Sequence, residues 1–158
     1  MIYFNIYKSI IIHRGGRHMI EINLKEGMTH SIQKKVDYYD SSVSFGREGM
    51  ETLFTTPSLV TMMIEAAVQL VGKNIPEGFV SVVKKIELSH EKPTLQGVTV
   101  TIEARVKEIK GNTVFISATC FDELGEIARG IQERHIVNKK ALINRAHERA
   151  AILEGKNR

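Results

Sequence analysis

The sequence predicts an α+β fold in which an antiparallel sheet wraps around one long central helix, with a further helix at the C-terminus. Two observations carry this prediction. Residues 55–72 form a helix-favouring stretch that is almost entirely apolar, and four strand-like segments joined by short turns follow it. A sheet with one apolar face needs a cover, and an apolar helix needs surrounding structure, so each of these two elements satisfies the other.

The central helix has boundary signals at both ends. Pro57 suits the first helical position, Thr56 before it can cap the free amides, and Gly72 can end the helix in a left-handed conformation. The side chains between them are so uniformly apolar that we expect no face of this helix to meet water. Glu65 is the single carboxylate within it. Since an unpaired buried carboxylate is costly, we expect Glu65 to have a partner or a chemical role.

The strand-like segments alternate apolar and polar residues. They cover residues 79–90, 98–109, 113–121 and 126–137, and one more, 29–36, precedes the helix. The connections are of hairpin length, which predicts an antiparallel meander. A strand, a long helix and four further strands in this order are typical of the hotdog fold. In that fold, pairs of subunits commonly join their sheets edge to edge and so remove exposed edges, which predicts a homodimer.

Composition restricts the class of protein. The 158 residues fit one domain with a real core, and no apolar run reaches 18 residues, so we expect no membrane span. The single cysteine, Cys120, shares an alternating face with Val114 and Ile116. We interpret it as a small buried hydrophobe of a cytoplasmic protein, in preference to a reactive thiol. The sequence contains no cluster of Cys and His residues that would predict a metal site.

The net charge of +4 comes from the C-terminus. Residues 139–158 contain six Lys or Arg residues against Glu148 and Glu154. A solvated basic helix is the simpler interpretation, and a surface for nucleotide phosphates is the alternative. Nucleic acid is an unlikely partner, because nothing resembles an aromatic RNA-binding platform or a recognition helix.

The sequence predicts that the chain is divided into three segments. Residues 1–18 are predicted to be an extension before an internal start at Met19, because Arg14-Gly15-Gly16 can be encoded by a ribosome-binding sequence just before that methionine. Residues 19–138 form the predicted hotdog domain, and residues 139–158 form the basic C-terminal helix.

Several short motifs in fixed order resemble one family. The pieces are Phe54-Thr55-Thr56-Pro57-Ser58-Leu59-Val60, Glu65-Ala66-Ala67, Leu88-Ser89-His90, Gly97-Val98-Thr99-Val100, Asp122-Glu123-Leu124-Gly125-Glu126-Ile127 and Gly130-Ile131-Gln132-Glu133-Arg134. From about Gly27 to Ala141, the chain resembles the hotdog-fold thioesterases similar to fluoroacetyl-CoA thioesterase. The resemblance implies hydrolysis of a small or medium acyl-CoA thioester, with no metal or redox cofactor and with coenzyme A entering as part of the substrate.

The same resemblance implies a Thr, a Glu and a His beside the thioester. The Thr corresponds to Thr56 and the His to His90, whereas the position of the family's Glu falls on Ile64, one residue before Glu65. One residue is a rotation of about 100° around a helix. The glycine expected seven residues before the His is Val83. These two departures favour the alternative function, a non-catalytic acyl-CoA binding or regulatory module.

Thioester hydrolysis gives each candidate a role, and each also has a simpler interpretation. Glu65 would act as base or nucleophile, His90 as acid and base, and Thr56 as the hydroxyl that orients water or the carbonyl. Alternatively, Thr56 is an ordinary helix cap, Glu65 joins a hydrogen-bonded row with its helical neighbours, and His90 is a solvated loop residue. Arg134 is interpreted as an ion-pair residue on the sheet surface in preference to a ligand of CoA phosphates.

Overall fold

The computed structural model describes residues 9–11, 20–42 and 49–155. It contains seven strands and two long helices within these ranges, and a short 3-10 helix at Tyr38–Asp40. In chain order the elements are β1 (Ser9–Ile11), β2 (Ile20–Ile22), β3 (Thr29–Lys35), α1 (Thr56–Gly72), β4 (Phe79–His90), β5 (Thr99–Lys110), β6 (Thr113–Asp122), β7 (Gly125–Asn138) and α2 (Lys139–Gly155).

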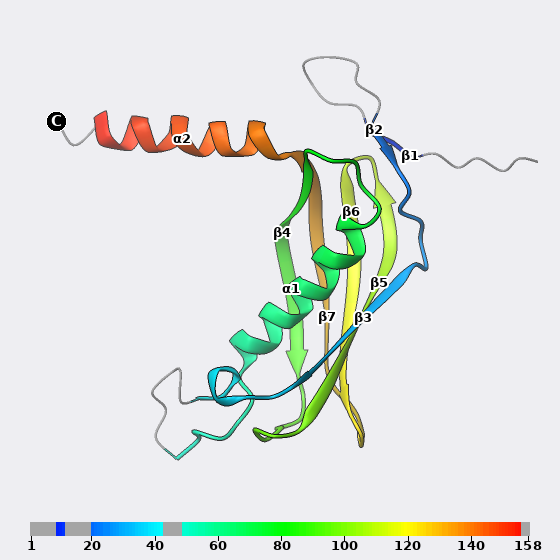
Figure 1. Cartoon of the computed structure of the whole chain (residues 1–158), viewed down its shortest axis with the longest axis vertical. Coiled ribbons are helices and arrows are strands. Elements are labelled where there is room, and N and C mark those ends of the chain that lie inside the picture. Colours follow the sequence, from blue (N-terminus) through cyan, green and yellow to red (C-terminus); the bar gives the residue numbers. More distant parts are fainter. Residues whose placement is uncertain (1–8, 12–19, 43–48, 156–158) are drawn as a thin grey trace, which may run out of the picture.

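Five strands form one antiparallel sheet in the order β3-β5-β6-β7-β4, and α1 lies across one face of it (Figure 1). The remaining strands, β1 and β2, pair with each other in a separate two-stranded sheet. The predicted antiparallel sheet over a long helix is therefore confirmed. The order leaves β3 and β4 as the two outer strands of the main sheet.

The core lies between α1 and the sheet. Alternate residues of β5 and β6 are almost fully buried, as the period of two predicts. They are Val100, Ile102, Ala104, Val106, Val114, Ile116, Ala118 and Cys120. Met62 and Met63 of α1 are also buried, so both methionines are core residues. Burial raises the pKa of the Cys120 thiol to about 12, which agrees with an inert side chain.

Both ends of α1 differ from the sequence prediction. The residue that caps the helix is Thr55, whose hydroxyl accepts a hydrogen bond from the Ser58 amide at 3.4 Å. The assignment of Thr56 as the cap is therefore wrong by one residue. At the other end, Gly72 is the last helical residue and the chain continues through Lys73 in a right-handed conformation, so the predicted left-handed stop is also wrong.

One side of α1 faces solvent in the single chain. Thr61, Glu65 and Val68 are exposed, and Val68 retains 43 % of its accessible surface. The expectation of a helix without a water-facing side is wrong for this chain, because the curved sheet covers only the opposite side of the helix. Val68 therefore adds an apolar side chain to the exposed side of the helix.

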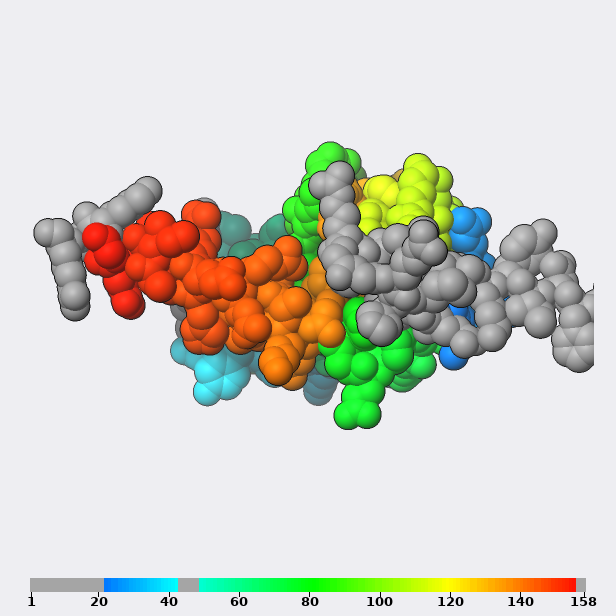
Figure 2. All heavy atoms as spheres, turned by 90° about the horizontal axis from the view of Figure 1, so that it is seen from above, coloured from blue at the N-terminus to red at the C-terminus, as the bar shows by residue number. Residues whose placement is uncertain are grey.

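Helix α2 extends away from the sheet, beyond the edge formed by β4 (Figure 1). It has no buried residue, and in the view from above, where it is drawn in orange to red, it extends to one side of the sheet (Figure 2). Its first residue is anchored to the start of β4, since the Lys139 amide donates to the Gly78 carbonyl at 2.9 Å. The predicted internal start, Met19, lies outside the described residues and stays a prediction.

Candidate functional site

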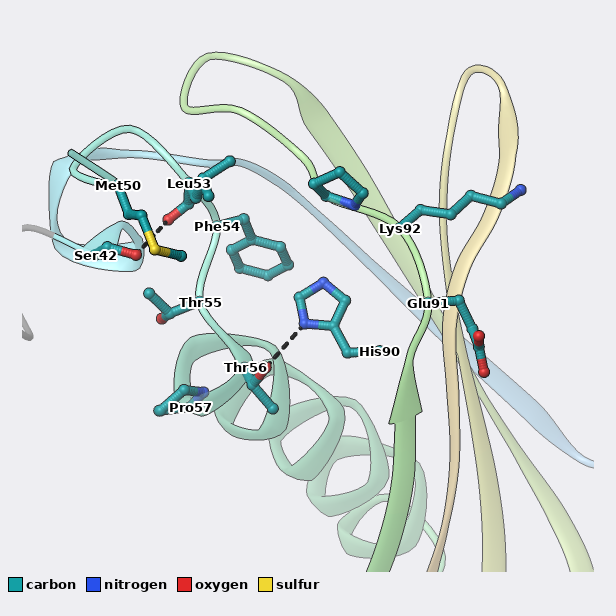
Figure 3. Close-up of a pocket in the computed structure, with 11 residues that line it drawn as sticks. Ser42, Met50, Leu53, Phe54, Thr55, Thr56, Pro57, His90, Glu91 and Lys92 are labelled. Carbon is teal, nitrogen blue, oxygen red and sulfur yellow. Dashed lines mark hydrogen bonds between the residues drawn. The ribbon is translucent and has the colours of Figure 1, made fainter. Parts of the chain in front are cut away.

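A cavity of about 590 Å³ opens where the N-terminus of α1 meets the end of β4 and the loop that follows it (Figure 3). This volume is typical of small-molecule sites. Its lining combines apolar side chains with a few polar groups. The lining residues are Ser42, Met50, Leu53, Phe54, Thr55, Thr56, Pro57, His90, Glu91, Lys92 and Pro93.

Thr56 and His90 meet in this cavity. The Thr56 hydroxyl lies 3.0 Å from His90 Nδ1, which is within hydrogen-bonding distance. Because Thr55 caps the helix, the Thr56 hydroxyl is not engaged with the amides of α1. The interpretation of Thr56 as an ordinary cap therefore does not hold, and the residues that the resemblance implied are adjacent.

His90 is the last residue of β4 and is half-buried, so it is not a solvated loop residue. Its ring lies between Thr56 and Phe54 (Figure 3), and the Phe54 ring approaches edge-on with a centroid distance of 6.1 Å. Burial lowers the pKa of His90 below its ordinary value of 6.5, and the backbone of Lys92 opposes this shift more weakly. The imidazole is therefore neutral at neutral pH and able to accept a proton.

The other ring nitrogen of His90 is enclosed by protein. Nε2 is buried and has no hydrogen-bond partner among the described residues. Nδ1, beside Thr56, is therefore the ring nitrogen that can exchange a proton with the cavity. When Nδ1 is free to accept a proton, the neutral ring carries its hydrogen on Nε2.

Gly130 allows β4 to approach β7 closely just before His90. A Cβ atom at Gly130 would lie 2.7 Å from the Glu87 carbonyl oxygen and 3.1 Å from the Leu88 Cβ. The two strands pair Leu88 with Gly130 and His90 with Ala128. The absent side chain at Gly130 therefore helps to set the position of the imidazole. This role of Gly130 was not predicted from the sequence, although an isolated glycine inside a strand pattern signals a close backbone approach.

Glu65 lies outside the cavity that contains Thr56 and His90. Its carboxylate accepts a hydrogen bond from Gln69 Nε2 at 3.2 Å, and Gln69 Oε1 lies 2.8 Å from His30 Nε2 on β3. Glu65 is exposed and is not a lining residue of the cavity. The expectation that its carboxylate is buried is wrong, and the alternative of a hydrogen-bonded row with Gln69 agrees with the structure. Nine residues separate it from Thr56, a rise of roughly 14 Å along α1.

The two ionisable neighbours of His90 in the chain also face away from the cavity. Figure 3 shows the side chains of Glu91 and Lys92 pointing away from the imidazole, and Glu91 is hydrogen-bonded to the Ser89 hydroxyl. Among the described lining residues, His90 is thus the ionisable group that faces the space beside Thr56. The arrangement can hold a hydroxyl and a neutral base against a bound ester.

Arg134 is not the surface residue that the sequence suggested. It is 1 % exposed and donates to the side chain of Gln132 and to the hydroxyl and carbonyl of Ser81. Desolvation lowers its pKa to about 10. Gln132 in turn donates to the Met63 carbonyl at 2.8 Å. This network joins β4, β7 and α1 beneath the helix, so Arg134 has a structural position away from the cavity.

Among the described residues, no group of three or more His, Cys, Asp or Glu side chains is arranged to hold a metal ion. None of the helices in the described part of the chain combines the length and apolarity that crossing a membrane requires.

Comparison with known proteins shows which family this geometry represents. The model of the fluoroacetyl-CoA-specific thioesterase family matches residues 36–140. A hot-dog-like protein from Thermanaerovibrio acidaminovorans is 32 % identical with a TM-score of 0.76, and the match covers 80 % of this chain and 93 % of that one. No curated protein matches the sequence.

Two further solved structures share the fold. A point mutant of the fluoroacetyl-CoA-specific thioesterase is 20 % identical with a TM-score of 0.74, over 80 % of this chain and 97 % of that one. A thioesterase superfamily member from Thermus thermophilus is 24 % identical with a TM-score of 0.71, over 81 % and 96 %. The predictions of a hotdog fold and of a thioester hydrolase are confirmed. The chain belongs to the fluoroacetyl-CoA-specific thioesterase family of hotdog proteins.

Proposed function

We propose that this protein is a cytoplasmic, homodimeric thioesterase that hydrolyses a small or medium acyl-CoA. The observation that carries the proposal is the 3.0 Å contact between the Thr56 hydroxyl and His90 Nδ1 inside a cavity of about 590 Å³. The cavity is lined by apolar side chains such as Met50, Leu53 and Phe54. Such a lining favours an acyl group, and the volume favours a short one.

The chemistry uses the two polar groups in complementary ways. His90 takes a proton from the attacking water as the water adds to the thioester carbonyl, and it then returns that proton to the departing CoA thiolate. The Thr56 hydroxyl orients the water or the carbonyl. The cavity lies at the N-terminus of α1, where the helix dipole favours the negative charge of the tetrahedral oxyanion. The products are the carboxylic acid and free CoA.

The homodimer is supported by two unpartnered surfaces. Strand β4 is an outer strand of the main sheet, and an exposed strand edge is normally paired or protected. Val68, on the exposed side of α1, is 43 % accessible, and Ile64 on the preceding turn is partly buried. A second copy joined through β4 would pair the free edge and place further structure beside this side of the helix.

The proposed mechanism does not include Glu65. Its carboxylate is bonded to Gln69, which contacts His30 on β3, whereas His90 lies on β4 at the opposite edge of the sheet. Ile64 occupies the position of the family's carboxylate. These two observations favour a second candidate function, a non-catalytic acyl-CoA binding or regulatory module.

A panel of acyl-CoA esters separates the two candidate functions. Thiol release is measured for the wild type, His90→Ala and Glu65→Gln, and binding of the same esters is measured by calorimetry. We expect turnover by the wild type and a loss of about 10²-fold or more in His90→Ala. If the wild type binds the esters without releasing thiol, the binding module is the correct function.

A further inference from the structure

Two polar side-chain atoms are buried without a hydrogen-bond partner among the described residues. They are His90 Nε2, in the candidate site, and Thr94 Oγ1, in the loop that follows β4. Thr94 is only 4 % exposed, so its hydroxyl is closed off from bulk solvent. Because a buried donor or acceptor that stays unpaired is unfavourable, each of these two atoms needs a partner.

Phe54 connects the two residues. The Phe54 amide donates to the Thr94 carbonyl at 2.8 Å, next to an isolated antiparallel bridge between Leu53 and Leu95. Phe54 and Thr94 therefore lie opposite each other, and opposite residues of antiparallel segments have their side chains on the same face, with Cβ atoms about 5 Å apart. Since the Phe54 ring also contacts the imidazole of His90 at a centroid distance of 6.1 Å, the side chains of Thr94 and His90 are both its neighbours.

The imidazole presents its second nitrogen to the loop after β4. Nδ1 lies 3.0 Å from the Thr56 hydroxyl, and Figure 3 shows the other ring nitrogen pointing away from Thr56, toward the loop that follows Lys92. This loop is held against β7, because the amides of Glu91 and Lys92 both donate to the Ile127 carbonyl, at 2.9 and 3.2 Å. Nε2 thus faces the segment that carries Thr94.

The contact that Nε2 makes decides the tautomer of His90. The proposed hydrolysis uses Nδ1 as the proton acceptor, so the hydrogen of the neutral ring must be on Nε2. If this buried hydrogen has no acceptor, the ring gains by carrying it on Nδ1 instead, where the Thr56 oxygen accepts it. In that tautomer Nδ1 cannot take a proton from water. An acceptor at Nε2 is therefore a requirement for His90 to act as the base.

We propose that Thr94 is a positioning residue for His90. Its hydroxyl oxygen accepts the Nε2 hydrogen, directly or through one bound water, and so holds the ring in the tautomer whose Nδ1 is free. A hydroxyl suits this place, because its oxygen accepts while its own hydrogen turns toward another acceptor. A water that bridges otherwise unpaired buried groups is an ordinary part of protein interiors. The effect on rate rests on the proposed function, whereas the tautomer is a property of the free protein.

Nitrogen-15 NMR of the free protein identifies the tautomer, because protonated and unprotonated ring nitrogens have different chemical shifts. At neutral pH we expect the wild type to carry the hydrogen of His90 on Nε2. Thr94→Val keeps the shape of the side chain and removes the hydroxyl, so it should move the hydrogen toward Nδ1, and Thr94→Ser should restore the wild-type tautomer. A Thr94→Val protein with the tautomer of the wild type, or a wild type with the hydrogen on Nδ1, would overturn the proposal.

The kinetic test uses the same variants. Thr94→Val should lower kcat about tenfold, since one hydrogen bond of ordinary strength favours the competent tautomer by a factor of that size. The acid limb of kcat/KM should move about one pH unit lower, because loss of the acceptor disfavours the doubly protonated ring. KM should change little, because Thr94 does not line the cavity. Thr94→Ser should behave like the wild type in each respect.

Thr52→Val is the matched control. It removes an exposed hydroxyl from the segment that pairs with the loop after β4, and it should leave kcat and the acid limb unchanged. If Thr94→Val also leaves both unchanged in an active enzyme, the proposal is wrong. If the wild type hydrolyses no thioester, the NMR result still decides the role of Thr94, so this inference and the proposed function fail separately.

Stability and a crystal structure provide two further tests. A hydroxyl that stays buried without a partner is unfavourable, so in that case Thr94→Val would be more stable to chemical denaturation than the wild type. We expect it to be less stable, because an imidazole N–H loses its acceptor. A high-resolution crystal structure of the wild type needs no variant. His90 Nε2 and Thr94 Oγ1 should lie within about 3.5 Å of each other or of one shared water, and a structure with neither contact would contradict the proposal.

Discussion

Replacing Gly130 with alanine should disturb the position of His90 without touching the cavity. The new Cβ would lie 2.7 Å from the Glu87 carbonyl oxygen, whereas ordinary contact begins at 3.4 Å. The atoms must therefore separate by about 0.7 Å, and the obstacle is backbone, which cannot rotate aside. Because Leu88 pairs with Gly130 and is two residues from His90, much of this shift should reach the imidazole.

The shift has two measurable consequences. A displacement approaching 1 Å in a catalytic group costs up to about 10²-fold in rate, so we expect kcat to fall at least tenfold. Overpacking of this kind also destabilises a fold by about 1–3 kcal/mol, which chemical denaturation measures. Gly72→Ala is the matched control, because a Cβ there meets no atom within 4 Å. It should preserve kcat and, because alanine favours a helix more than glycine does, raise stability by up to about 1 kcal/mol. A Gly130→Ala protein with the kcat of the wild type would refute this reasoning.

Other predictions follow from individual side chains. Thr55→Ala should lower the free energy of unfolding by about 1 kcal/mol through loss of the cap. Thr56→Ala should instead reduce kcat about 10²-fold with little change in stability. If both variants lowered the stability equally, the assignment of Thr55 as the cap and Thr56 as a residue of the active site would be contradicted. Glu65→Gln should leave kcat close to that of the wild type, because Glu65 is not a lining residue of the cavity. A loss of about 10²-fold would instead identify Glu65 as catalytic. The Cys120 thiol, with its pKa raised to about 12, should react with a thiol reagent at pH 8 about 10³-fold more slowly in the native protein than in the unfolded chain; similar rates would exclude the buried environment.

Elements with a strong local pattern were predictable from sequence. The alternation of β5 and β6 and the apolar run of α1 gave element bounds within one or two residues of those in the structure. The strand Phe79–His90 was predicted with the bounds that the structure has. Strands β1 and β2 are three residues each, too short to produce a periodic signal.

The errors concern single residues and have physical causes. Thr55 and Thr56 are both good caps, and nothing local decides between them. The side of α1 that meets the sheet is decided by tertiary packing, so the exposure of Glu65 could not be derived from an apolar run. Arg134 is different, because strand alternation places it on the same face as Gln132 and Ile136, and all three are buried. The two-residue period of the strand could therefore have predicted the burial of Arg134.

The contact between Thr56 and His90 was anticipated only through family resemblance. The residues are 34 positions apart, and no periodicity links a helix start to a strand end. The fold brings them together because α1 begins, and β4 ends, at the same end of the molecule (Figure 1).

The pH dependence of kcat/KM for an acyl-CoA tests the central claim most directly. His90 must be neutral to accept a proton, and burial lowers its pKa below 6.5. Activity should therefore rise with pH through a single acid limb whose midpoint lies below 6.5, reach a plateau by neutral pH, and lose that limb in His90→Ala. A midpoint above 6.5, or a limb that persists in His90→Ala, would show that another group performs the proton transfer.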